Sequence, residues 1–233
     1  MTLRHSITDT FPQASARQHP LLDCEPTDPR VLRVDLEGNG EGQMTVCVPA
    51  VKRLADFDLG AAPTVNPATV ATLAGGGYME AGDPVVLLGD SGTGKSHLLI
   101  GLGVAACEQA KRVRYATCAQ LVNELAEAAD DRRLSRLVAR YGRLELLCLD
   151  ELGYVKLDAR GSELLFQILT EREEKSSIAL ATNLPFSEWG QVVPDPRLVG
   201  AIVDRVTFNA HIIETGTESY RLRTTKTKRR PKN

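Results

Sequence analysis

One stretch constrains the fold of this chain more than any other. Residues 85–96 read Val-Val-Leu-Leu-Gly-Asp-Ser-Gly-Thr-Gly-Lys-Ser, and His-Leu-Leu-Ile at 97–100 then begins an apolar helical pattern. The pattern predicts a short buried strand, a Gly-x-x-x-x-Gly-Lys-Ser loop and the start of a helix. Such a loop turns its backbone N–H groups inward, where they can bind the phosphates of a nucleotide. A chance match in a glycine-rich turn would lack the strand and the helix, so the sequence predicts a phosphate-binding loop.

The loop residues have different expected roles. The ammonium of Lys95 would reach the β- and γ-phosphates of ATP, and the Ser96 hydroxyl would bind Mg²⁺. The residues expected to bind the nucleotide are Gly89, Asp90, Ser91, Gly92, Thr93, Gly94, Lys95 and Ser96.

Strands and helices alternate after this loop, which predicts an α/β fold with a parallel five-stranded sheet flanked by helices. The predicted strands are 85–88, 113–116, 144–149, 178–183 and 210–214. The predicted helices are 95–109, a second opened by a capping box at 117–120, 134–141, one capped by Asp158 and running to about 173, and 198–206. Before the core, a short helix at 66–73 and a flexible Gly75–Gly77 are expected, and 31–36 is expected to pair with 44–48 as a hairpin.

Polar residues follow two of these strands. Asp150 and Glu151 end the strand 144–149, and Asn183 ends the strand 178–183. Carboxyl ends of parallel strands share one edge of a sheet, so these residues would lie beside the phosphate loop. Asp150 would bind Mg²⁺, Glu151 would act as the general base for an attacking water, and Asn183 would orient that water or the γ-phosphate. The alternative for each is ordinary turn chemistry.

Arginines concentrate at 132–143. Arg132, Arg136 and Arg140 recur every four residues and are expected on one face of a helix, with no acid interleaved. Either this is a solvated helix face, or its like-charge repulsion is offset by an anionic partner such as DNA. The end of the chain adds to the second interpretation, because residues 221–233 carry seven basic side chains and no acidic one.

The composition sets the broader class. Of 233 residues, 42% are apolar and 25% are charged, as in a soluble globular protein. The five cysteines form no Cys-x-x-Cys pair, which favours a reducing, cytoplasmic compartment over disulfides or a metal centre. No apolar run suggests secretion or a membrane span. We expect an irregular extension at 1–50, an ATPase domain at 51–223 and a disordered basic tail at 224–233.

The block 51–223 resembles the transposition helper ATPases of IstB type, which are relatives of the DnaC-type helicase loaders and belong to the AAA+ class of oligomeric ATPases. The resemblance rests on the runs 54–58, 89–98, 149–154, 182–189 and 218–222, among which Asp-Glu-Leu-Gly-Tyr and Ser-Glu-Trp-Gly are the narrowest.

The resemblance implies roles that spacing does not show. Asn183 would be the first sensor residue, Arg221 a second sensor, and Arg205 an arginine finger that enters the site of the neighbouring subunit. Family members assemble as rings or spirals on DNA and deliver it to a transposase, here one of an IstA/IstB-type insertion sequence. The chain departs from the family at residues 1–50, which show no helical apolar period where the family carries a helical docking module.

Three other functions stay open beside a DNA-dependent ATPase of transposition. A DnaC-type helicase loader would use the same ATP site in DNA replication. A nucleotide-binding remnant would lack the docking module. A metabolic phosphoryl transferase would share the loop, although Asp150, Glu151 and Asn183 suit attack by water better than transfer to an acceptor.

Overall fold

A five-stranded parallel sheet forms the centre of the molecule. The computed structural model describes residues 32–34, 44–46 and 52–220. The strand order is β4-β5-β6-β3-β7, and every neighbouring pair is parallel. The strands are β3 (Val85–Leu88), β4 (Val113–Thr117), β5 (Leu146–Leu152), β6 (Ser177–Thr182) and β7 (His211–Glu214). All five lie where the sequence predicts strands, although β5 continues through Asp150 and Glu151 to Leu152, beyond its predicted end at 149.

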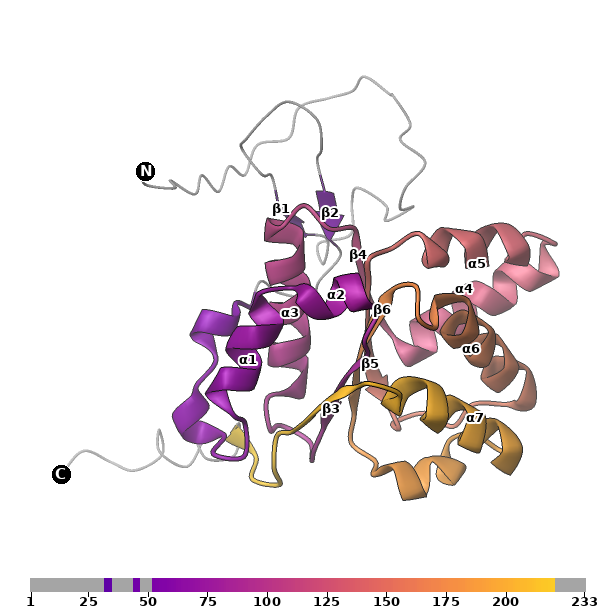
Figure 1. The fold of residues 1–233 in the computed structure, drawn as a ribbon. Helices are drawn as coiled ribbons and strands as arrows, with labels where there is room; N and C mark the ends of the chain where they lie inside the picture. The colour runs from indigo at the N-terminus through magenta and orange to yellow at the C-terminus, as the bar shows by residue number, and fades with distance from the viewer. Residues whose placement is uncertain (1–31, 35–43, 47–51, 221–233) are drawn as a thin grey trace.

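Helices cover both faces of the sheet (Figure 1). One face carries α1 (Pro67–Ala74), α2 (Gly77–Ala81) and α3 (Lys95–Glu108). The other carries α4 (Cys118–Asp130), α5 (Leu134–Gly142), α6 (Ala159–Arg172) and α7 (Pro196–Thr207). Each layer buries its own apolar cluster, which is why the central strands read as nearly continuous apolar runs.

The helix starts follow from local side-chain chemistry. The capping box predicted at Thr117 and Gln120 is present, with both of its hydrogen bonds formed. The Asp158 carboxylate accepts a hydrogen bond from the Gly161 N–H at 2.6 Å, and Asp195 caps α7 in the same way. These caps satisfy N–H groups that the first helical turn leaves unpaired. The predicted starts at Thr117 and Asp158 are confirmed, whereas α7 begins at Pro196, two residues before the predicted start at 198.

Shorter elements complete the described chain. The 3₁₀ helices are η1 (Leu54–Asp56), η2 (Leu59–Ala61) and η3 (Phe186–Gln191), and η3 buries Trp189, which is 2% exposed. The predicted hairpin is confirmed as β1 (Leu32–Val34) paired antiparallel with β2 (Met44–Val46). Three cysteines, Cys107, Cys118 and Cys148, are buried as free thiols.

Two local predictions are wrong. Gly75–Gly77 is a tight connection between α1 and α2 rather than a flexible stretch, because Gly76 takes a left-handed φ of 82° and Gly77 already begins α2. Arg132 does not share a helix face with Arg136 and Arg140. Its own φ is 58°, and α5 begins only at Leu134.

Some predictions concern residues beyond this description. The irregular segment 1–30, the basic tail 224–233 and the second-sensor assignment of Arg221 lie outside the described residues. Within the described residues, no helix has both the length and the apolar content needed to cross a membrane.

Candidate functional site

The loop between β3 and α3 turns on glycines that no other residue could replace without strain. Gly92 and Gly94 have φ values of 83° and 102°, in the region that favours glycine. A Cβ on Gly94 would lie 2.6 Å from Cε2 of Phe57, far inside van der Waals contact. The segment before the core therefore packs directly on the phosphate-binding loop.

The segment after β7 holds the same loop from the other side. The Thr215 N–H donates to the Leu88 carbonyl at 2.8 Å, and the hydroxyls of Thr93 and Thr215 are 2.6 Å apart. The Tyr220 N–H donates to the Gly92 carbonyl at 3.0 Å. The sequence did not predict these contacts of segment 215–220, because nothing in that segment identifies Thr93 as the partner of Thr215, 122 residues earlier.

Lys95 is 6% exposed, and its ammonium donates to the Asp90 carbonyl at 2.7 Å. It is also the first residue of α3, where the helix dipole presents its positive end. A phosphate group bound at this helix start would lie beside the Lys95 ammonium and would accept hydrogen bonds from N–H groups of the first helical turn.

Asp150 is 4% exposed and both of its carboxylate oxygens accept hydrogen bonds. The Tyr115 hydroxyl donates to Oδ2 at 2.7 Å, and the Glu151 backbone N–H donates to Oδ1 at 2.8 Å. Glu151 is exposed and has a φ of 62°, which costs a non-glycine residue about 1–2 kcal/mol. Strained backbone of this kind often occurs at functional sites.

One cavity of about 540 Å³ joins these parts. Loop residues 91–97 line it together with Asp150 and Glu151, so the structure brings the predicted phosphate-binding residues and the predicted carboxylates together. Gly89 and Asp90 belong to the loop but do not line the cavity. The other lining residues are Lys52, Asp56, Phe57, Asp58, Ala61, Ala62, Tyr154, Ala181 and Tyr220.

Three aromatic lining residues, Phe57, Tyr154 and Tyr220, were not predicted as site residues. Phe57 stacks edge-on against His97 with ring centroids 5.4 Å apart, while Tyr154 and Tyr220 are 53% and 45% exposed. They come from three segments far apart in the sequence. All three lie in the runs 54–58, 149–154 and 218–222 that carry the family resemblance, and this was the signal in the sequence that could have identified them.

Asn183 lies at the same edge of the sheet but does not line the cavity. A Cβ on Gly153 would lie 2.5 Å from Asn183 Oδ1, so the amide packs against the loop that follows Glu151. That Oδ1 is buried and has no hydrogen-bond partner among the described residues.

The oxygen-rich part of the cavity fits Mg²⁺ by its chemistry. Ser96 offers a hydroxyl and Asp150 a carboxylate, and hard oxygen ligands of this type suit Mg²⁺. Among the described residues there is no group of three or more His, Cys, Asp or Glu that could hold a metal ion. A magnesium ion here would therefore take its remaining oxygens from nucleotide phosphates and water.

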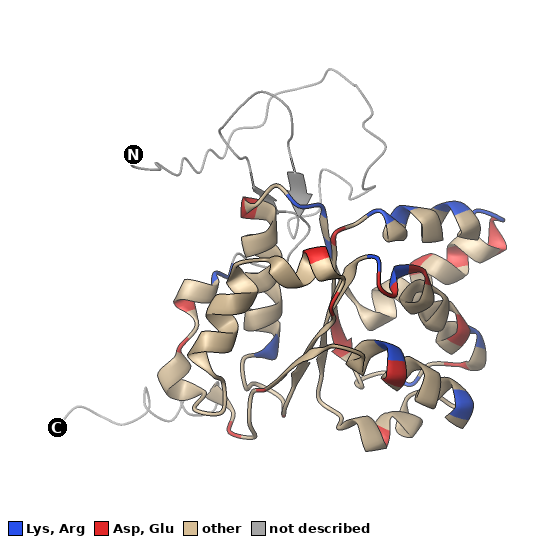
Figure 2. Cartoon of the chain, viewed as in Figure 1, with Lys and Arg blue, Asp and Glu red and all other residues tan. Residues whose placement is uncertain are grey.

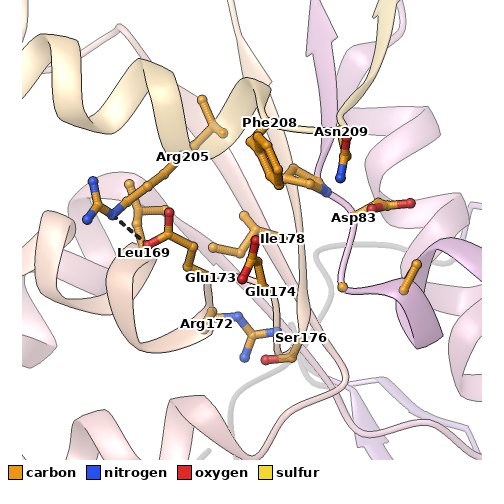
Figure 3. Close-up of a pocket in the computed structure, with 14 residues that line it drawn as sticks. Asp83, Leu169, Arg172, Glu173, Glu174, Ser176, Ile178, Arg205, Phe208 and Asn209 are labelled. Carbon is orange, nitrogen blue, oxygen red and sulfur yellow. Dashed lines mark ion pairs between the residues drawn. The ribbon is translucent and has the colours of Figure 1, made fainter.

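Arg205 lies elsewhere, in a second cavity of about 210 Å³ (Figure 3). Pro84, Ser176 and Asn209 line this cavity and stand just before β3, β6 and β7, so it lies at the amino edge of the sheet. The Arg205 Nε is 3.1 Å from Glu173 Oε2, and its guanidinium carbon is 4.4 Å from the centre of the Phe166 ring.

The same cavity is lined by Arg172, which is 1% exposed. Its guanidinium donates to the carbonyls of Tyr141 and Ser177, the latter at 2.6 Å. Burial lowers the pKa of Arg172 to about 10, so the side chain remains charged at neutral pH. Arg172 thus joins the end of α5 to the start of β6 and has a structural role.

Of the arginines expected to contact DNA, Arg136 and Arg140 lie on α5 and Arg132 precedes it. Figure 2 shows basic bands along this helix. Arg132 and Arg136 are exposed and Arg140 is half-buried. The two acids that precede α5 form ion pairs with arginines outside this set. Asp131 pairs with Arg133, and Asp130 pairs with Arg160.

Comparison with known proteins identifies the family. The family of IstB-like ATP binding proteins matches residues 39–228. The chain is 37% identical over 76% of its length to an insertion sequence ATP-binding protein of Sinorhizobium fredii. It is 36% identical over 76% to the IS21 ATP-binding protein of Pseudomonas aeruginosa, and 33% identical over 75% to that of IS232 from Bacillus thuringiensis. The chain spans 59%, 66% and 70% of these three relatives.

Solved structures show the fold. DnaA from Aquifex aeolicus, bound to AMPPCP, superposes with a TM-score of 0.58 at 22% identity over 76% of this chain and 53% of that one. The DnaC helicase loader superposes with a TM-score of 0.53 at 20% identity over 63% of this chain and 86% of that one. The fold is that of an AAA+ P-loop protein, as the sequence predicts, and the chain belongs to the family of IstB-like ATP binding proteins.

Proposed function

We propose that this member of the IstB-like family is the ATPase of an insertion sequence, which binds ATP and hydrolyses it to ADP and phosphate. One observation carries the proposal: the phosphate loop 91–96 and the carboxylates Asp150 and Glu151 line a single cavity. A loop alone would support binding. A loop facing an exposed carboxylate supports hydrolysis, because that carboxylate can accept a proton from water.

The chemistry assigns one task to each group. Water attacks the γ-phosphorus, a new P–O bond forms, the bond to the bridging oxygen breaks, and ADP leaves with that oxygen. Glu151 accepts the proton of the attacking water. Lys95 and the N–H groups of the loop neutralise phosphate charge. Mg²⁺, bound by Ser96 and Asp150, would neutralise further charge on the phosphates. Asn183 would hold the loop after Glu151 in place and reach the attacking water when nucleotide is bound.

The site is completed by a second copy of the chain. Arg205 lines a cavity at the amino edge of the sheet, whereas the phosphate loop follows the carboxyl end of β3. A strand of four residues spans about 13 Å, which separates Arg205 from the phosphate loop of its own chain. A neighbour in a ring or spiral would present Arg205 to that loop as an arginine finger, and hydrolysis would depend on assembly.

Mixing two inactive variants tests this arrangement. Lys95→Ala and Arg205→Ala should each lower hydrolysis by about 100-fold or more, because each removes a charge that stabilises the transition state. Their equimolar mixture should recover about a quarter of wild-type activity, since a quarter of randomly formed head-to-tail interfaces would contain both intact residues.

The control is Arg197→Ala, which removes an exposed arginine from the same helix without touching either cavity. It should hydrolyse ATP normally and give no gain on mixing. A mixture of the first two variants that shows only their summed activity would place Arg205 outside the neighbour's site. Nucleotide binding that survives Lys95→Ala unchanged would refute the ATP site itself.

The proposal extends to DNA and to a transposase of an IstA/IstB-type element. Arg136 and Arg140 lie one turn apart on α5, and neither forms an ion pair within residues 52–220. If both contact phosphates, the variant with both changed to alanine should show a weaker salt dependence. The slope of log binding constant for duplex DNA against log salt concentration should fall in magnitude by about 2. Arg160→Ala is the control, because Arg160 pairs with Asp130. An unchanged slope would mean that Arg136 and Arg140 lie on a solvated helix face and do not contact DNA.

A further inference from the structure

The Tyr115 hydroxyl is a hydrogen-bond donor that the sequence analysis did not anticipate at this site. Tyr115 lies on β4 opposite Cys148 of β5, and Thr117 lies opposite Asp150. Side chains two residues apart on a strand point to the same face of the sheet, so the Tyr115 ring can extend along that face to Asp150. Its hydroxyl donates to Asp150 Oδ2 at 2.7 Å.

The second carboxylate oxygen of Asp150 holds the backbone of Glu151. The Glu151 N–H donates to Oδ1 at 2.8 Å, and Glu151 keeps a left-handed φ of 62°. A planar carboxylate with a partner on each oxygen cannot rotate without losing one of them. The Tyr115 bond therefore influences both the carboxylate plane and the strained backbone that presents Glu151.

We propose that Tyr115 is a positioning residue that orients Asp150 for Mg²⁺ and, through Asp150, keeps Glu151 directed at the cavity. This inference rests on the proposed function of the site. Tyr115 itself does not line the cavity, so it acts only through Asp150. Outer residues that orient a metal ligand commonly change metal affinity or activity by about 10–100-fold.

The chain contains a matched control. The Tyr141 hydroxyl donates to Glu124 Oε2, also at 2.7 Å, and Tyr141 is 3% exposed. This second tyrosine–carboxylate bond joins α5 to α4, and neither residue lines the nucleotide cavity. Tyr141→Phe and Tyr115→Phe remove the same atom from the same kind of hydrogen bond, and only one of these bonds involves the site.

The experiment measures binding of a fluorescent ATP analogue as a function of Mg²⁺ concentration, and separately in EDTA. Tyr115→Phe should raise by about 10-fold the Mg²⁺ concentration at which the increase in analogue binding is half-maximal, and should leave the affinity for the analogue in EDTA within twofold of wild type. In steady-state hydrolysis of ATP, it should lower kcat by a larger factor than it raises KM. Tyr141→Phe should change none of these quantities, although both variants lose stability.

Four results decide between the possibilities. Mg²⁺ dependence within twofold of wild type in Tyr115→Phe overturns the positioning role, and so does an equal change in Tyr141→Phe. Affinities report only the folded fraction, so partial unfolding does not imitate the expected shift. If Lys95→Ala binds the analogue like wild type, the proposed ATP site fails. If Lys95→Ala abolishes binding while Tyr115→Phe changes nothing, the site stands and only this inference fails.

Discussion

Under the proposed function, the two cavities described above would hold complementary halves of one chemical task. The larger, at the carboxyl edge of the sheet, contains the phosphate loop, a buried lysine and two carboxylates. The smaller, at the amino edge, contains Arg205 held by Glu173 and Phe166. Among the residues that the structure describes, none lines both cavities. If the proposed function holds, a single chain binds nucleotide at one edge of the sheet and carries the last catalytic charge at the other edge.

The largest expected effect is at the carboxyl edge. Glu151→Gln should lower the rate of ATP hydrolysis by about 1,000-fold, because an amide cannot accept the proton of the attacking water. ATP binding should persist, since the loop and Asp150 are unchanged. Steady-state hydrolysis and equilibrium binding of ATP check these two expectations.

The control for this variant is Glu163→Gln, which makes the same chemical change at an exposed position of α6. It should hydrolyse ATP at the wild-type rate. If Glu151→Gln also hydrolysed ATP at that rate, the general base would have to be another residue, and the larger cavity would lose its catalytic half.

A smaller effect is expected where the loop meets the segment before the core. Gly94→Ala should weaken ATP binding by about 10-fold or more, because a Cβ would meet the Phe57 ring at 2.6 Å and the residue has a φ of 102°. Isothermal titration with ATP measures the loss.

Gly200→Ala is the matched control, because a Cβ there meets nothing within 4 Å and the residue lies inside α7. It should bind ATP normally and raise stability by about 0.5–1 kcal/mol, as removal of a helix glycine usually does. Equal ATP affinity in both variants would show that the phosphate loop can bind ATP with a different backbone conformation at residue 94.

The smallest effect is expected at the amino edge. Glu173→Gln removes the charge that pairs with Arg205, whose side chain is 21% exposed. Partly exposed ion pairs contribute about 0.2–1 kcal/mol, so the protein concentration for half-maximal hydrolysis should fall by about 2–5-fold as Arg205 becomes free to reach a neighbour.

Glu174→Gln is the control, since Glu174 lines the same cavity and forms no ion pair with Arg205. Titration of hydrolysis against protein concentration compares the two. If Glu173→Gln instead needed a higher protein concentration for half-maximal hydrolysis, Glu173 would orient Arg205 toward the neighbouring subunit rather than hold it back.

Much of the fold could be predicted because its signals are local. The apolar strands, the capping box at Thr117 and the Gly-Lys-Ser loop depend on residues within a few positions of one another. The errors are also local. A glycine run such as Gly75–Gly77 suits a flexible linker and a left-handed turn equally well, and an arginine period continues in the sequence although the helix does not include Arg132.

The sequence by itself determined the class of this protein, because a phosphate loop between strand and helix and an acidic pair after another apolar run specify nucleotide chemistry through spacing alone. Only the tertiary structure decided which distant groups support that chemistry. Tyr115 reaches Asp150 and Thr215 reaches Thr93 because strand order makes β5 the neighbour of β4 and β7 the neighbour of β3. Hydrogen bonds depend on distances of about 3 Å in space, and sequence separation does not encode them.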